Sequence, residues 1–533
     1  MTVTLLLSIA ANHYSYDQGV ISGVLVMNNF VISPIPISPS PTNCSQGKQF
    51  PTLAHDATLQ GWMVAVLTLG AMFGALINGP LADRLSRRWD LLLANIIFLI
   101  GSIIQCSAVN VAMIFIGRFI AGLAIGQLSM VVPLYLSELA PPNIRGSLVA
   151  LQQLGITVGI MIAFWLDYGT QHIGGTGDSQ SPIAWRLPLA LQCLPSLILA
   201  CGTFFLPYSP RWLMNRGSSF MLPTKSLIYT NTSPGREEEA RTTLCRLRRV
   251  DPSDHRLRLE LLEIKAAVMF DEEVVAAKFP GITSHFVLAV KQYQELFFVR
   301  HLNRRLVIAC LLQIIQQFTG INAIIYYAPT IFTDIGLTGN SVNLLATGVV
   351  GVINFLSTIP AILYMDRWGR KKVLIIGGVG MAISQLIVGT LFAVYKDSWA
   401  THRAAGWAAA VFIWIYISNF AFSIGKLRLL NLISKDNQLT FLSGCVNWIM
   451  PSEIFPPGVR SKAVGVAIST NWLTNVRCFS IPTVSFKELI FYIVHRSPHH
   501  APHVEIHHFR HILFLPRLLH HSRRLGVLLR PRN

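Results

Sequence analysis

An acidic residue lies inside a long apolar run near the start of the chain. Asp17 follows this run in the segment Tyr16-Asp17-Gln18-Gly19. Ionisable groups within apolar spans are costly and usually functional. A carboxylate removed from water favours its neutral, protonated form, so Asp17 could bind and release a proton near neutral pH. The obvious partner is Arg118 in another apolar run. The alternative is a permanently ionised Asp17 locked to that arginine, and the sequence leaves both open.

Uncharged amides form a second set of candidates. Four of them recur within one apolar run at intervals of about one helical turn or half a turn more, so several face a common direction: Gln313, Gln316, Gln317 and Asn322. Others lie in further runs: Gln152, Gln153, Asn354, Asn471 and Asn475. An amide both donates and accepts hydrogen bonds, which suits a neutral polyhydroxylated ligand. Trp448 and Trp472 could stack on a sugar ring. The alternative is hydrogen bonding between helices, worth about 0.6 kcal/mol each. The number of amides favours a polar cavity.

The elements that must position these residues are membrane-spanning helices. The 533-residue chain is 52% hydrophobic and 13% charged, and its apolar blocks approach the roughly 20 residues that cross a bilayer. Backbone polar groups cannot stay open in lipid, which requires helices. We predict eleven spans, near 4–27, 60–81, 91–109, 111–135, 148–167, 185–206, 305–328, 342–364, 373–394, 407–425 and 461–475. The sequence therefore predicts an all-α, multi-pass membrane protein.

The net charge of +18 first suggests nucleic acid, but its distribution argues against that partner. Basic residues crowd the connections after the second, fourth, sixth, eighth and tenth spans. This positive-inside pattern places the N-terminus in the cytoplasm. The eight cysteines are scattered and imply no disulfide framework. Asn43-Cys44-Ser45 is a glycosylation sequon in the first outer connection, so Asn43 is the candidate acceptor.

Two pairs of segments repeat along the chain. Ser137-Glu138 through Arg145 resembles Ser452-Glu453 through Arg460, and Asp83 to Arg88 resembles Asp366 to Lys371. Secondary transporters are commonly built from two such copies. Carboxylates and guanidiniums at these places could pair across the cytoplasmic ends and form a gate; the alternative is that they only set topology. The candidate gate residues are Asp83, Arg84, Arg88, Glu138, Arg145, Asp366, Arg367, Arg370, Glu453 and Arg460.

The repeat also divides the chain. We predict an N-terminal bundle over 1–206, a cytoplasmic connection with short amphipathic helices over 207–304, and a C-terminal bundle over 305–475. The segments 218–235 and 426–445 interrupt the repeat as extra sequence. Residues 476–533 form a basic, histidine-rich tail. The pairs His499-His500, His507-His508 and His520-His521 have neither cysteine companions nor regular helical spacing, so we expect no metal site there.

These motifs identify a resemblance to the sugar porters of the major facilitator superfamily, particularly fungal hexose transporters. The segments that carry it include Gly79 to Arg88, Pro133 to Glu138, Pro207 to Leu213 and Gln316 to Tyr327. The resemblance implies two six-helix bundles that work by alternating access. It implies sugar contacts from Gln153, Gln316, Gln317, Asn322, Asn354, Trp448 and Asn471. It also implies an outer gate at Tyr326 and Tyr327, and proton coupling through Asp17 with Arg118.

The chain departs from the family pattern at several points. Ser86 replaces the usual glycine of the first gate motif, and Tyr208 stands where many members have glutamate. The family lacks the segments 218–235 and 426–445, and its pattern stops after residue 475 without a twelfth span. We predict that these segments arise from translated introns or a frameshift. The chain as written would then be inactive while an edited version transports; robust uptake by the unedited chain would contradict this.

The expected function is transport of a monosaccharide together with a proton across the plasma membrane. We expect no catalysed reaction, no cofactor and no nucleic-acid partner, and we expect a monomer in contact with membrane lipid. Three alternatives stay open: a passive sugar facilitator, a membrane sugar sensor that does not transport, and an inactive truncated gene product. The sequence does not identify the sugar, because hexose, pentose, polyol and quinate carriers share these motifs.

Overall fold

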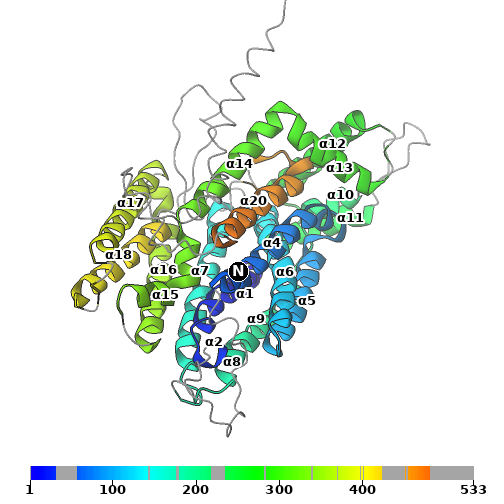
Figure 1. Cartoon of the computed structure of the whole chain (residues 1–533). Helices are drawn as coiled ribbons and strands as arrows, with labels where there is room; N and C mark the ends of the chain where they lie inside the picture. Colours follow the sequence, from blue (N-terminus) through cyan, green and yellow to red (C-terminus); the bar gives the residue numbers. More distant parts are fainter. Residues whose placement is uncertain are drawn as a thin grey trace, which may run out of the picture. The chain divides into compact units, whose positions relative to one another are not determined.

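The computed structural model describes residues 2–31, 57–141, 145–175, 179–217, 234–280, 282, 284–337, 340–368, 370–395, 398–399, 401–422, 451 and 454–480. Within these ranges the chain is built from helices joined by short connections (Figure 1). The first half contains α1 (Thr2–Val24), α2 (Asn28–Val31), α4 (Ala57–Leu85), α5 (Arg87–Cys106), α6 (Val111–Leu139), α7 (Arg145–Thr170), α8 (Ile183–Leu191) and α9 (Cys193–Thr203). The connection contains α10 (Pro210–Gly217), α11 (Pro234–Arg248), α12 (His255–Lys278) and α13 (His285–Phe298). The second half contains α14 (Arg300–Phe318), α15 (Ile321–Asp334), α16 (Asn340–Trp368), α17 (Arg370–Tyr395), α18 (Arg403–Phe422), the 3₁₀ turn η3 (Pro457–Val459) and α20 (Arg460–Ser480).

All eleven predicted spans coincide with helices. Among the described residues, eight stretches are long and apolar enough to cross a bilayer: Leu59–Leu85, Arg87–Cys106, Val111–Leu139, Ile183–Thr203, Arg300–Asp334, Val342–Pro360, Ile376–Tyr395 and Arg403–Ala421. Two predicted spans are interrupted. α8 and α9 are separated at Gln192, where Pro195 cannot donate a hydrogen bond back to Leu191. α14 and α15 are separated at Gly320, which has a φ of 87°.

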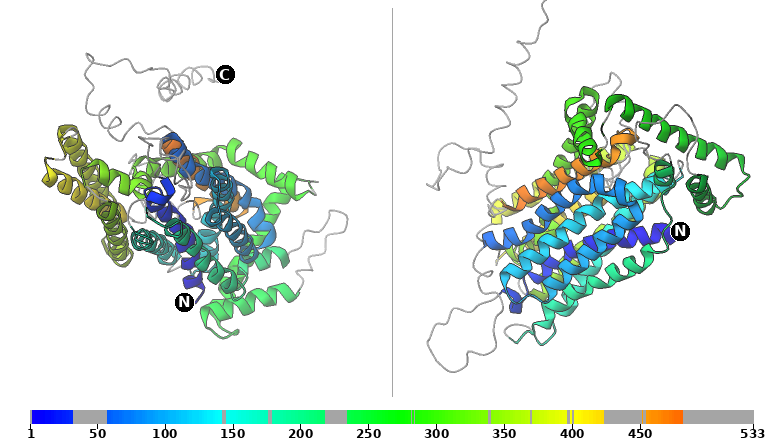
Figure 2. Two further views of the ribbon diagram at one scale, coloured as in Figure 1. Left: turned by 60° about the horizontal axis from the view of Figure 1, so that its bottom comes forward. Right: turned by 90° about the vertical axis from the view of Figure 1, so that its right-hand side faces the viewer.

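The packing of the helices reflects the duplicated sequence. α4 and α16 are the second spans of their halves, and α7 and α20 are the fifth. α4 packs along α20, and α16 packs along α7, so each second span contacts the fifth span of the other half (Figure 1). The long helices run side by side, and α1 begins at the same end of the bundle as the connection helices α10 and α11 (Figure 2, right). This arrangement agrees with an N-terminus on the side of the basic connection.

Glycines bring α4 and α6 into direct backbone contact. A Cβ atom on Gly74 of α4 would overlap the backbone oxygen of Leu123 in α6, and one on Gly126 of α6 would overlap the oxygen of Ala71 in α4. Small residues allow membrane helices to approach this closely, because van der Waals packing replaces the hydrophobic drive that is absent in lipid. α4 and α6 therefore form one tightly joined pair.

The connection helices are joined by apolar contacts and ion pairs. Leu213 and Met214 of α10 pack with Ala240 of α11 and Val268 of α12. Arg211 of α10 pairs with Asp271 of α12 at 3.0 Å. Burial raises the pKa of Asp271, and the adjacent Arg211 guanidinium opposes that shift. Residues 218–233 and the whole of 426–445 lie outside the described residues, as does the tail beyond residue 480.

Candidate functional site

The predicted amides of α14, α15 and α20 meet in one buried hydrogen-bonded cluster. Asn471 Nδ2 donates to Gln313 Oε1 at 2.7 Å and to Gln316 Oε1 at 3.2 Å. Gln317 Nε2 donates to Asn471 Oδ1 at 2.9 Å, and Asn322 Nδ2 donates to Gln317 Oε1 at 2.7 Å. Four of these residues were predicted to contact sugar; the fifth, Gln313, was named only among the candidate amides. An amide cluster of this kind can exchange its internal hydrogen bonds for bonds to a polar neutral ligand.

The break at Gly320 places Asn322 within reach of the cluster. α14 ends at Phe318, and α15 starts again at Ile321 after the left-handed glycine. Tyr416 of α18 donates from its hydroxyl to the Thr319 backbone oxygen at 2.7 Å, which satisfies a carbonyl at the interruption. Gln317 and Asn322 therefore belong to two different helices and not to the one continuous helix that the sequence had suggested. The two amides are nevertheless hydrogen-bonded to each other.

Replacing Gly320 with alanine should destabilise the protein. Open space surrounds the site of the new Cβ, so the cost is conformational: an L-residue in the left-handed region loses about 1–2 kcal/mol. Thermal unfolding of detergent-purified protein measures this loss. The matched control is Gly378→Ala in α17, where the Cβ site is also open and φ is not positive; it should be neutral or stabilising by up to about 1 kcal/mol. Equal effects of the two substitutions would contradict the explanation.

The other predicted sugar contacts lie on separate helices. Gln153 of α7 is half-buried and Asn354 of α16 is buried, and neither side chain makes a hydrogen bond within the described part of the chain. Trp472 of α20 donates from Nε1 to Ser129 Oγ of α6 at 3.2 Å, which links the two halves. Asn475, one turn beyond Asn471, is fully buried, and its amide has no hydrogen-bond partner among the described residues. Trp448 lies outside the described residues, as does the sequon residue Asn43.

Asp17 and Arg118 form the predicted pair between α1 and α6. Arg118 Nη1 lies 4.0 Å from Asp17 Oδ2, and both side chains are fully buried. Arg118 donates from Nε to the Met63 backbone oxygen of α4 at 2.8 Å. Neither oxygen of Asp17 accepts a hydrogen bond from the described residues. The pair is therefore in contact without the short hydrogen bonds of a tight arginine–carboxylate pair, which lie near 2.7–2.9 Å.

The two predicted outer-gate tyrosines lie near this pair, in an apolar cluster that joins the halves. Tyr326 of α15 is buried, and Tyr327 is partly buried beside it; both pack with first-half residues that include Val20, Met27 and Phe30. α15 kinks at Tyr327, two residues before Pro329. Tyr326 is also close enough to Asp17 and Arg118 to interact electrostatically with both. The cluster therefore packs α15 against α1.

Where α4 and α6 end and α5 begins, Arg87 lies at the centre of a charge network. It donates to Glu138 Oε1 from Nε at 3.2 Å and from Nη2 at 2.9 Å, and it also pairs with Asp83 at 3.2 Å. Ser209 donates to the second Glu138 oxygen at 2.6 Å. Asp83 and Glu138 were predicted gate residues. Arg87 was not singled out, although its position four residues after Asp83 is the spacing of a helical ion pair.

The same network crosses to the second half through Asp83. Ser461 donates to Asp83 Oδ2 at 2.5 Å, and Lys462 pairs with that oxygen at 2.8 Å. Both partners lie in α20, next to the predicted residue Arg460, which instead donates to the Phe455 backbone oxygen at 3.3 Å. Neither Ser461 nor Lys462 was among the predicted gate residues.

Arg88 contacts the end of the sixth span, just after α9. It donates to the Phe204 backbone oxygen at 2.8 Å, and its guanidinium lies 5.3 Å from the ring centroid of Tyr208. Tyr208, at the position where many sugar porters have glutamate, thus still contacts a cation, through its ring. Five predicted gate residues have side chains outside the described part of the structure: Arg145, Asp366, Arg367, Arg370 and Glu453. The predicted gate residue Arg84 is described and interacts with other residues.

Ser86 occupies a backbone conformation that favours glycine. Its φ is 84° and its ψ is 151°, a region that costs a non-glycine residue about 1–3 kcal/mol. Its hydroxyl reaches the Trp89 backbone N–H only at 3.5 Å, so the cap offsets little of that cost. Ser86→Gly should therefore raise the free energy of unfolding by about 1 kcal/mol, measured by denaturation in detergent. A loss of stability in that variant would show that the serine cap outweighs the backbone strain.

Comparison with known proteins places this geometry in a family. The family model described as "Sugar (and other) transporter" matches residues 3–430 and 440–494. The chain belongs to this sugar transporter family. A relative, the major facilitator-type transporter ecdD of Aspergillus rugulosus, is 34% identical over 485 residues, which cover 88% of this chain and 75% of that protein. The glucose transporter GlcP of Staphylococcus epidermidis is 33% identical over 456 residues, which cover 85% and 80%.

Solved structures confirm the major facilitator fold of this transporter. The major facilitator superfamily proton:xylose symporter XylE bound to 6-bromo-6-deoxy-D-glucose superposes with a TM-score of 0.67 at 27% identity, covering 92% of this chain and 90% of that one. The inward-open XylE from E. coli superposes with a TM-score of 0.61 at 26% identity. The predicted fold class, membrane character and family resemblance are thus confirmed.

Proposed function

We propose that this transporter carries a monosaccharide across the plasma membrane by alternating access, coupled to a proton, and acts as a monomer. Family membership supports sugar transport, and the relatives named above include a glucose transporter and a proton:xylose symporter. The observation that carries the proton coupling is the fully buried Asp17, which faces Arg118 at 4.0 Å without a hydrogen bond.

The amide cluster is the proposed sugar site. Gln316, Gln317, Asn322 and Asn471 present donors and acceptors to one another, and hydroxyl groups of a sugar could replace these bonds one for one. Gln153 and Asn354 would add contacts from α7 and α16, because their side chains are not engaged within the described chain. A neutral, amide-lined site of this type discriminates through hydrogen-bond geometry and not through charge.

The proposed coupling step is protonation of Asp17. A buried pair that stays ionised should draw close and form short hydrogen bonds, because the low dielectric strengthens its attraction. The longer distance between Asp17 and Arg118 suits a carboxyl group that alternates between a protonated state and an ionised state paired with the arginine. Protonation would release Arg118 from the pairing, while its bond to the Met63 oxygen keeps it attached to α4.

Two contacts between the halves would act as gates. On the cytoplasmic side, Lys462 and Ser461 of α20 hold Asp83 of α4. On the outer side, Tyr326 packs into the apolar cluster with Met27 and Phe30. Alternating access requires that each contact part while the other holds. The proximity of Tyr326 to Asp17 supports a link between proton binding and the outer gate.

We also keep the proposal that residues 426–445 are extra sequence. The match to the family model stops over 431–439, inside this segment, which supports the proposal. The match continues through 218–235 and on to residue 494, and so lends no such support there. Sequencing of the spliced transcript tests 218–235, 426–445 and the tail after residue 475. A message that encodes all three segments intact would contradict the proposal.

Uptake by reconstituted vesicles tests the function. The full chain and a version without 218–235 and 426–445 are each placed in vesicles with an imposed inward proton gradient. Labelled glucose should accumulate in at least one of them, and unlabelled sugars, polyols and quinate as competitors define the substrate. Accumulation that stops at equilibrium with or without the gradient would indicate a passive facilitator. Binding without any uptake by either version would indicate a sensor.

A further inference from the structure

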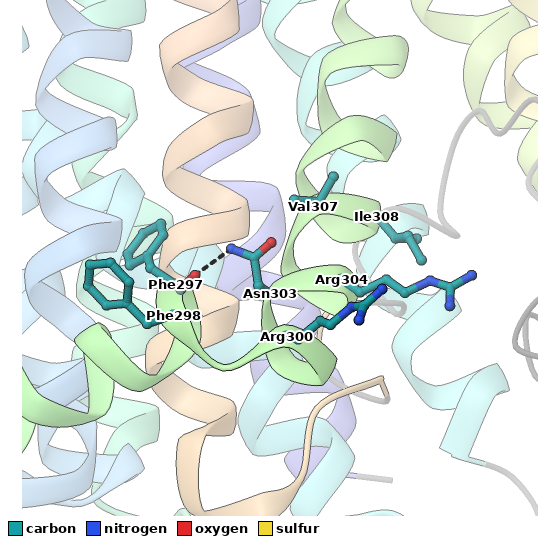
Figure 3. Close-up of a pocket in the computed structure, with 7 residues that line it drawn as sticks. All are labelled: Phe297, Phe298, Arg300, Asn303, Arg304, Val307 and Ile308. Atoms are coloured by element: carbon teal, nitrogen blue, oxygen red, sulfur yellow. Dashed lines mark hydrogen bonds between the residues drawn. The ribbon is translucent and has the colours of Figure 1, made fainter. Parts of the chain in front are cut away.

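A hollow opens on the surface where α13 meets α14. It has a volume of about 780 Å³ and is lined by Phe297, Phe298, Arg300, Asn303, Arg304, Val307 and Ile308 (Figure 3). Asn303 Nδ2 donates to the Phe297 backbone oxygen at 2.7 Å and fixes the turn between the two helices. The two arginines extend along one side of the hollow, and the two phenylalanines lie on the other (Figure 3). The proposed sugar and proton sites contain none of these residues.

The two arginines have no partner within the described chain. Neither guanidinium makes a hydrogen bond or an ion pair there, and none of the seven lining residues is acidic. The nearby Glu295 is already paired with Lys278 of α12. Elsewhere in the connection, arginines such as Arg211 and Arg248 are paired with carboxylates. The hollow therefore carries two positive charges that the described protein leaves uncompensated.

Apolar side chains extend from these charges along α14. At 100° per residue, Arg300, Arg304, Val307, Leu311 and Phe318 fall within an arc of about 60° on one face of the helix. Val307, Leu311 and Phe318 are all exposed, and the apolar stretch that starts at Arg300 is long enough to cross a bilayer. The arginine pair thus stands at the head of a stripe suited to contact a hydrocarbon chain.

α13 has the exposed apolar face of a helix at a membrane surface. Its exposed apolar residues are Phe286, Val287, Val290, Phe297 and Phe298, the last being 84% exposed. They fall within an arc of about 120° on one face, interrupted by Gln294. The opposite face is buried through Ala289, Gln292 and Leu296. A helix with such an exposed apolar face is typical of one that lies in the interface of a bilayer.

We propose that this hollow binds the headgroup of an anionic phospholipid of the cytoplasmic leaflet. Arg300 and Arg304 would hold the phosphate and the acidic headgroup, as guanidiniums bind such groups well. One acyl chain would follow Val307 and Leu311 into the membrane. The basic connection places this end of α14 in the cytoplasm, where anionic lipids are concentrated. The site lies next to the turn that joins the connection helices to the second half, so a bound lipid would anchor that turn at the membrane.

Native mass spectrometry of the full chain in detergent tests this site. The protein is titrated with dioleoyl phosphatidylserine and, separately, with dioleoyl phosphatidylcholine. Phosphatidylserine should bind more tightly, and the Arg300→Gln, Arg304→Gln double variant should lose about thirtyfold in affinity, because each basic residue at the surface contributes about a fivefold factor. The matched control is Arg256→Gln with Arg258→Gln, two exposed arginines of α12 in the same connection.

Three results would overturn the proposal. Equal affinity for the two lipids would remove the role of the charge. An equal loss in the α12 control would show that general charge, and not this hollow, attracts the lipid. Displacement of phosphatidylserine by inorganic phosphate in tenfold excess would identify a simple anion site. If the double glutamine variant does not fold, each single variant should bind about fivefold more weakly, and the double lysine variant, which keeps the charge, should retain most of the binding.

Discussion

Replacing Asp17 with asparagine should abolish uphill sugar uptake while sparing exchange of sugar across the membrane. The amide keeps the shape of the carboxyl group but cannot bind and release a proton. One proton entering along a potential of 100 mV supplies about 2.3 kcal/mol, which corresponds to about fortyfold accumulation at equilibrium. The variant should therefore lose that factor completely. The proposed sugar site should still bind sugar, because the amide cluster lies on α14, α15 and α20 while Asp17 lies on α1.

Vesicles that contain the active version of the transporter provide the measurement. Accumulation of labelled sugar is followed under an imposed gradient, and exchange is followed without one. The matched control is Asp167→Asn on α7, an equally buried carboxylate that lies against Gly23 of α1 and has no ion pair in the described structure. This control should keep its accumulation. Unchanged accumulation in Asp17→Asn would favour a passive facilitator and remove Asp17 from the coupling.

Replacing Arg87 with glutamine should cause the largest loss of stability of the substitutions considered. The Arg87 side chain is 9% exposed and that of Glu138 is 4% exposed. Removing one partner of a buried pair leaves an uncompensated charge, and this costs about 3–5 kcal/mol. Denaturation in detergent measures the change in the free energy of unfolding. The double variant Arg87→Gln, Glu138→Gln should recover much of the loss, because it removes the stranded charge as well.

A more exposed pair supplies the control for this prediction. The side chains of Arg211 and Asp271 are 25% and 23% exposed, and water screens such a pair more strongly. Arg211→Gln should therefore cost only about 1 kcal/mol or less. If Arg87→Gln costs no more than Arg211→Gln, the network around Glu138 contributes little to stability. If the double variant is as unstable as the single one, packing and not charge explains the loss.

The arrangement of the spans could be predicted because lipid leaves the backbone few choices. Every predicted span became helical. The reciprocal packing of α4 on α20 and of α16 on α7 is consistent with the duplicated motifs, but it was not predicted. The interruptions were not predicted, although both had local signals. Pro195 lacks the N–H that would continue the hydrogen bonding of the sixth span as one helix. Gly320 readily adopts the left-handed conformation that ends α14.

The candidate site was predicted where residue type alone is informative. Amides and a carboxylate are rare enough in apolar runs to be noticed, and the structure brings Gln317 to Asn471 and Asp17 to Arg118. Where several basic residues are clustered, the sequence could not show which of them pairs with a given carboxylate. Arg84, Arg87 and Arg88 are close neighbours, and helix phase decides which one points to Glu138. Lys462 meets Asp83 only because α20 packs on α4, which no local pattern records.

The backbone contact between α4 and α6 has a mechanical consequence. Since no side chain separates Gly74 from Leu123 or Gly126 from Ala71, the two backbones are in direct contact, and we expect the helices to move as one body. Near one end of this helix pair Arg118 of α6 donates a hydrogen bond to the Met63 oxygen of α4, and at the other end Asp83 of α4 pairs with Lys462. The twenty residues from Met63 to Asp83 span about 30 Å of helix. If Asp17 binds the proton as proposed, a tilt of the pair at the Arg118 end would also move the Asp83 end, which holds α20.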